Sequence, residues 1–153
     1  MTKLFLILHV LAAVVAIGPV TVAASMFPKA LRHAHSGAGD GEALTTLRTL
    51  HRICRVYAAV GIAVPVFGFA TAGSLGVLGS AWLIASILLT AAAAGLLALL
   101  ILPAQEGALA SVRASGSDPG SPGRLAMLTG VFNLLWATVT VLMIIRPGST
   151  TGA

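Results

Sequence analysis

A histidine inside an apolar run is the first residue of this sequence that could do chemistry. His9 lies in the segment LHVLAAVVAIGP, residues 8–19, and no Lys, Arg, Asp or Glu occurs between positions 4 and 27. An ionisable side chain within a membrane span is costly, because few partners are available for its polar atoms there, and it commonly marks a functional site. His9 is therefore the centre of the predicted site.

Polar side chains on three other apolar runs are expected to share that site. Counting about 1.5 Å per residue from the outer end of each run places one polar residue of every run roughly 7–8 Å deep. These four residues are His9, Thr71, Ser86 and Thr140, and Thr90 and Asn133 lie deeper. The predicted ligand-binding residues, or lining of a polar cavity, are His9, Thr71, Ser86, Thr90, Asn133, Trp136 and Thr140. The alternative is packing, since Ser and Thr in membrane helices often bond to their own backbone and Asn can fasten two helices.

Haem ligation is the alternative chemistry for His9. An axial ligand pair would need a second residue at a compatible depth, and Met143 is near the right level. The predicted metal ligand is therefore His9 if haem is present, and haem b is the cofactor of that alternative. The HAH segment at 33–35 and His51 lack a matching Cys or carboxylate cluster, so we expect solvated histidines there rather than a metal site. No nucleophile motif or paired carboxylate occurs, so a non-enzymatic protein is expected.

The composition explains which elements must position these side chains. Hydrophobic residues make up 58% of the 153 residues and charged residues 8%, and the mean hydropathy is +1.01. Because a span needs about 20 mostly apolar residues, four runs qualify, and a backbone in lipid bonds its polar groups internally as a helix. The first run is longer than the apolar region of a signal peptide, so we expect a retained helix. Pro19 and Pro65 are expected to interrupt their helices.

The predicted fold class is all-α, a four-transmembrane-helix bundle of a polytopic membrane protein. Residues 1–153 form a single membrane domain. The expected helices are about 4–27, 43–76, 80–105 and 124–146, and the expected cytoplasmic loops are 28–42 and 106–123.

Positive charge predicts the orientation. Seven of the nine Lys and Arg residues lie in or beside the two long loops, which places those loops in the cytoplasm and both termini outside. The expected location is the bacterial inner (cytoplasmic) membrane. The residues expected to meet anionic lipid headgroups are Lys29, Arg32, Arg48, Arg52 and Arg55.

Other partners follow from the same features. No motif for nucleic acid accompanies the basic residues, so no nucleic-acid partner is expected. Small residues mark helix faces that pack closely in lipid. These faces predict a homo-oligomer or an assembly with other membrane subunits.

Three stretches resemble a widespread family of predicted bacterial four-helix integral membrane proteins of unknown function. They are LHVLAAVVAIGP at 8–19, the start of the third helix at Trp82, and VLMIIRPG at 141–148. The chain is more distantly similar to copper-resistance D-type and protoporphyrinogen-oxidase-type membrane proteins. The resemblance implies a four-helix bundle. The first-helix histidine of the haem-associated proteins is a candidate haem ligand, so the resemblance implies the same role for His9.

These observations predict a small integral membrane protein that is non-enzymatic. It acts in binding or transport, or as an accessory subunit, through a polar site near the outer leaflet built around His9. The alternative is a haem-b-binding membrane redox protein with His9 as axial ligand.

Overall fold

The computed structural model describes residues 1–36, 40–114 and 121–148, and within these ranges the chain is all-α, with no strand. Four continuous or nearly continuous helices are long and apolar enough to cross a membrane. Their parts are α1 (Thr2–His35), α2 (Asp40–Val60), α3 (Ala63–Leu75), α4 (Ala81–Gly95), the π-helical segment η1 (Leu96–Ile101), α5 (Leu102–Arg113) and α6 (Pro122–Ile145). The predicted four-helix, all-α fold is confirmed.

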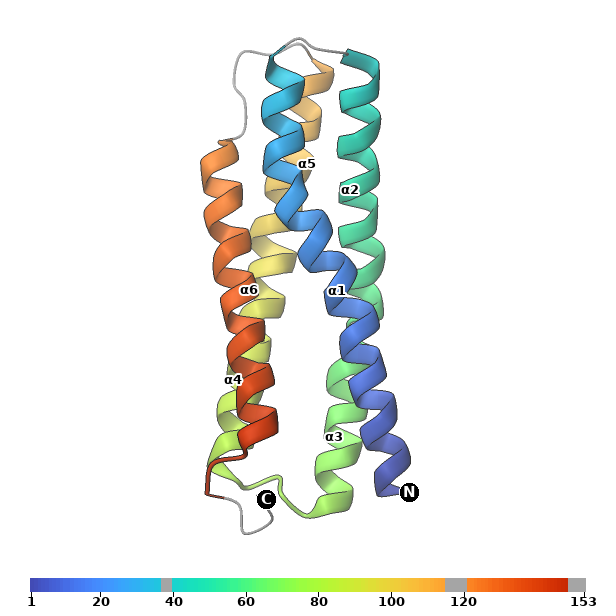
Figure 1. Ribbon diagram of the computed structural model, residues 1–153, viewed down its shortest axis with the longest axis vertical. Coiled ribbons are helices and arrows are strands. Elements are labelled where there is room, and N and C mark those ends of the chain that lie inside the picture. Colours follow the sequence, from blue (N-terminus) through green and yellow to red (C-terminus); the bar gives the residue numbers. More distant parts are fainter. Residues whose placement is uncertain (37–39, 115–120, 149–153) are drawn as a thin grey trace.

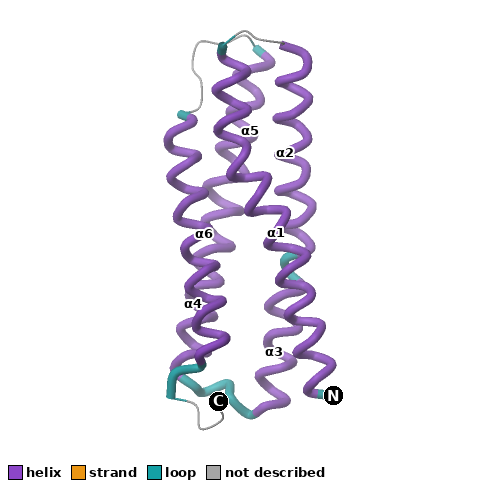
Figure 2. Tube along the Cα trace, viewed as in Figure 1, coloured by secondary structure: helices purple, strands orange, loops and turns teal. Residues whose placement is uncertain are grey.

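The helices run alternately up and down, so that the N-terminus and the described end of α6 lie at one end of the molecule (Figure 1). We call this the terminal end, and the opposite end, where α1 meets α2, the loop end. Helix α1 packs against α2 and α3, α4 packs against α6, and α2 packs against α5. Towards the terminal end the ribbons separate into two pairs, α1 with α3 and α4 with α6 (Figure 2).

Much of the surface is apolar, as a membrane requires. Large apolar side chains are exposed on every long helix, for example Val14, Leu99 and Leu134 at 67%, 74% and 69%. In water an apolar surface of this extent would drive association, whereas in a bilayer it contacts lipid. The protein is therefore a multi-pass membrane protein in its architecture.

The helices extend beyond the apolar runs at the loop end. Helix α1 ends at His35 rather than near 27, and α5 continues to Arg113 rather than ending near 105. The added turns are held by a cluster of small and apolar residues, the loop-end cluster: Ala23, Ala24, Phe27, Leu31, Leu47, Leu50, Cys54, Ala108, Leu109 and Leu125. Hydropathy marks where the lipid ends, but packing continues the helices past that border.

Prolines explain the irregular positions within the long helices. The interruption expected at Pro65 is present, because its ring has no N–H and crowds the carbonyl of Gly61, and the backbone breaks at 61–62 between α2 and α3. A Cβ at Gly61 would lie 3.1 Å from the Ala58 carbonyl oxygen, which suits glycine at this turn. Likewise, η1 ends two residues before Pro103, and there the helix widens, with the Leu102 N–H donating to Leu97 O.

Helix α1 contains both Pro19 and Pro28 and remains helical through them. It changes direction midway along its length (Figure 1). The expected interruption in this helix is therefore a bend, the usual consequence of a proline whose neighbours compensate its missing bond.

Candidate functional site

The His9 side chain projects from α1 against α3, and one hydrogen bond fixes its ring. Its Nδ1 is 2.8 Å from the backbone oxygen of Val64. Because a carbonyl oxygen only accepts, Nδ1 carries the hydrogen and donates it, and in the tautomer of the ring that has this single hydrogen the lone pair lies on Nε2. The ring is half-buried. Nδ1 is thus anchored, whereas Nε2 makes no hydrogen bond within the described part of the chain.

Gly68 provides the surface on which the imidazole rests. A Cβ added at position 68 would lie 3.0 Å from His9 Cε1 and 3.2 Å from Nδ1, which is tight enough that the ring would have to shift by a few tenths of an ångström. Val64 and Gly68 are four residues apart, so they occupy one face of α3. Glycine at 68 lets the histidine approach the helix backbone, as small residues do in membrane helix pairs.

Thr71 lies on the same face of α3, three residues after Gly68, and it is buried. Helical spacing therefore places Thr71 on the face of α3 that contacts His9 through Val64 and Gly68. The Thr71 hydroxyl, however, donates to Phe67 O of its own helix, 2.7 Å away.

The other predicted hydroxyls lie on the opposite pair of helices. Ser86 is fully buried on α4 and donates to Trp82 O at 2.8 Å. Thr140 is exposed on α6 and donates to Trp136 O at 2.9 Å, and Thr90 is half-buried on α4. The bonds that Ser86 and Thr140 make are back-bonds within one helix, the packing alternative for such residues.

Asn133 and Thr129 connect α6 to α1. Asn133 Nδ2 donates to Ser25 Oγ at 3.3 Å, and the Thr129 hydroxyl lies 3.5 Å from Ala24 O. Both contacts join residues more than 100 positions apart. They fasten the last helix to the first near the middle of the bundle.

Three buried polar atoms have no hydrogen-bond partner within the described part of the chain: Trp82 Nε1, Asn133 Oδ1 and Trp136 Nε1. Trp136 packs edge-on against Phe132, with ring centroids 6.3 Å apart. Two of the three atoms belong to predicted site residues that are one helical turn apart on α6. An acceptor and a donor therefore lie unsatisfied on one stretch of α6.

Trp82 forms an apolar cluster with Ala72 and Leu83 at the terminal end, and Met143 packs against it. The Arg146 guanidinium lies 5.7 Å from the centre of the Trp82 ring. Met143 is thus placed in the packing between α3, α4 and α6. His9, by contrast, is held by Val64 and Gly68 in the interface of α1 with α3.

A polar group that the sequence did not single out joins α2 to α5. Gln105 is fully buried, although polar side chains of its size are usually exposed. Its Oε1 accepts from His51 Nδ1 at 3.1 Å, and its Nε2 lies 3.6 Å from Cys54 Sγ. The three-residue spacing of His51 and Cys54 on a helix was the available signal, since it places both on one face.

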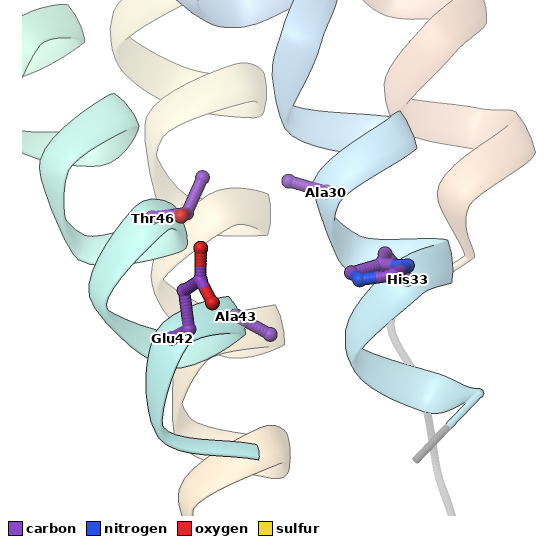
Figure 3. Close-up of a pocket in the computed structure, with 5 residues that line it drawn as sticks. All are labelled: Ala30, His33, Glu42, Ala43 and Thr46. Carbon is purple, nitrogen blue, oxygen red and sulfur yellow. The ribbon is translucent and has the colours of Figure 1, made fainter. Parts of the chain in front are cut away.

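A shallow pocket of about 130 Å³ opens between α1 and α2 at the loop end. His33 stands on one wall, and Glu42 and Thr46 stand on the other (Figure 3). All three side chains are exposed. The pocket is far from the predicted site along α1 and contains none of its residues.

The described residues include no group of three or more His, Cys, Asp or Glu side chains placed to hold a metal ion. His33 and His35 are exposed near the end of α1, whereas His51 bonds to Gln105. The loop histidines therefore do not gather into one site. Comparisons with family models, curated proteins and solved structures found no match for the chain.

Proposed function

We propose that this protein is a non-enzymatic membrane module that binds a small polar or lipidic ligand through His9. The proposal covers binding, transport and an accessory-subunit role. The observation that carries it is the Nδ1 bond to Val64 O, 2.8 Å long. It anchors the ring of an ionisable residue within a span and leaves Nε2 as a hydrogen-bond acceptor or ligand.

The proposed site lies near the outer leaflet of the bacterial inner membrane. The support is the charge distribution: the terminal end carries Lys3 and Arg146, whereas seven basic residues lie at the loop end. By the positive-inside rule, the loop end faces the cytoplasm. Thr71 belongs to the proposed site because it is buried and lies on the same face of α3 as Val64 and Gly68. Ser86, Thr90, Asn133, Trp136 and Thr140 remain predicted members on the other helices.

The test uses the full chain in detergent or nanodiscs and measures His9 directly. Diethyl pyrocarbonate modifies accessible imidazoles, and mass spectrometry of peptides reports which histidine reacts. We expect His9 to be modified, and native mass spectrometry to show a co-purified molecule that is lost in His9→Ala. The same bound species in His9→Ala, or a His9 that stays unmodified after the co-purified molecule has been washed out, overturns the proposal.

A second candidate function is haem binding, and the same hydrogen bond favours it. Histidines that ligate a metal commonly donate their other ring N–H to a carbonyl, which fixes the tautomer and the ring orientation. His9 fits the role of one axial ligand. Met143 packs instead with the Trp82 cluster, so the residues support a site with one protein ligand. Bound haem would supply one-electron redox chemistry.

Haemin titration distinguishes the two candidates. A Soret band that forms on purified protein and is lost in His9→Ala would support haem. Protein that is colourless from haem-replete cells and takes up no haemin excludes this second candidate. The co-purified species and the diethyl pyrocarbonate reaction still test the first.

A further inference from the structure

The observation that points beyond the His9 site is a stripe of three arginines on α2. Arg48, Arg52 and Arg55 are spaced by four and three residues, so they stack along one side of the helix. All three are exposed. We call them the arginine stripe, and we propose that it binds the headgroup of an anionic phospholipid at the cytoplasmic face of the membrane.

The opposite side of α2 fixes the direction of the stripe. Leu47, Leu50 and Cys54 are at most 7% exposed and belong to the loop-end cluster. Rotation of α2 would bring a guanidinium group into this packed core, where an unpaired charge is strongly unfavourable. The arginines are therefore held outward.

The stripe carries unfavourable like-charge neighbours. Arg48 faces Arg52 at the four-residue spacing, and Arg52 faces Arg55 at the three-residue spacing. Such pairs destabilise a helix. No Asp or Glu lies three or four residues from any of them to neutralise the charge. An anion bound across the stripe removes this repulsion and makes charge-assisted hydrogen bonds with the guanidinium groups.

The next turns of α2 and the start of α3 identify the anion as a lipid headgroup. Directly after Arg55 the exposed side chains become apolar, with Val56 50%, Val60 40% and Ile62 65% exposed. These residues contact hydrocarbon in a spanning helix. The stripe is about 10 Å long, similar to the depth of one headgroup layer. A guanidinium fork also matches phosphate oxygens better than an ammonium group does.

The test compares two triple variants with the same change in net charge. One is Arg48→Gln/Arg52→Gln/Arg55→Gln. The matched control is Lys3→Gln/Arg113→Gln/Arg124→Gln, whose exposed basic residues lie on three separate helices, two of them at the same end as the stripe. Native mass spectrometry counts bound phosphatidylglycerol against phosphatidylcholine with the same acyl chains. We expect the preference for phosphatidylglycerol to fall about tenfold or more in the stripe variant and to be retained in the control.

Equal losses in both variants, or no loss in the stripe variant, overturn the proposal. Circular dichroism confirms folding, and the single Arg52→Gln variant replaces the triple if the latter does not fold. Its expected loss is about fivefold, as one arginine near an anionic surface contributes. A competition experiment compares the release of bound lipid by inorganic phosphate with its release by chloride at equal ionic strength. Selective release of the lipid by phosphate would show a free-phosphate site and also overturn the proposal.

Discussion

His9 and Gly68 lie in direct contact, although they are on different helices. A Cβ at position 68 would come within 3.0 Å of His9 Cε1, and the same ring bonds to Val64 O one turn earlier on α3. The glycine thus determines how closely the histidine approaches the helix backbone.

Substituting Gly68→Ala should destabilise the protein by about 1–3 kcal/mol, because the added methyl group crowds an imidazole that its hydrogen bond to Val64 O holds in place. The loss should shrink in the double variant His9→Ala/Gly68→Ala, which removes the overlapping ring. Unfolding in increasing sodium dodecyl sulfate, followed by circular dichroism, measures both effects.

Gly73→Ala is the matched control, because a Cβ there meets no atom within 4 Å. This substitution should be neutral or stabilising by up to about 1 kcal/mol, since alanine is the better helix former. An equal response of the two glycines would contradict the contact between Gly68 and His9.

Gln105→Leu should cost about 1–3 kcal/mol, because it leaves the Nδ1 hydrogen of His51 without its partner. The neighbouring exposed substitution Glu106→Gln should change stability by less than about 0.5 kcal/mol. A double-mutant cycle with His51→Leu should give a coupling of about 0.5–3 kcal/mol. Additive effects would show that the two side chains do not interact.

Cys54 should react slowly with maleimide in the folded protein, because it is fully buried within the loop-end cluster. The comparison is Cys54→Ser/Thr49→Cys, which places the thiol on an exposed position of the same helix. We expect native Cys54 to react at least about tenfold more slowly, since local opening must come first. Equal rates before denaturation would mean that this part of the bundle is open.

The proposed orientation predicts which engineered thiols are accessible in intact cells. In the Cys54→Ser background, an impermeant maleimide should label Thr2→Cys from outside. It should label Ser36→Cys only after the membrane is permeabilised. Labelling of Ser36→Cys in intact cells would reverse the orientation and place the arginine stripe on the outer face.

The distribution of apolar and charged residues along the chain was sufficient to predict the four spans. The free-energy cost of placing a charge in lipid depends on each short segment alone. The proline at position 65 also predicted the nearby break in the helix, because the effect of its missing N–H is confined to one helical turn. Hydropathy did not predict the helix ends at His35 and Arg113. Those turns lie beyond the apolar runs and are held by side chains from other helices, including Phe27 and Leu47.

The sequence by itself therefore determined that this chain crosses a membrane and that His9 lies within a span. Only the tertiary structure decided which polar groups meet: His9 with Val64, 55 positions away, and His51 with Gln105, 54 positions away. The predicted depth of a side chain follows from counting residues. Its partner depends on how each helix is rotated and which helices pair, and these are set by packing across the whole bundle.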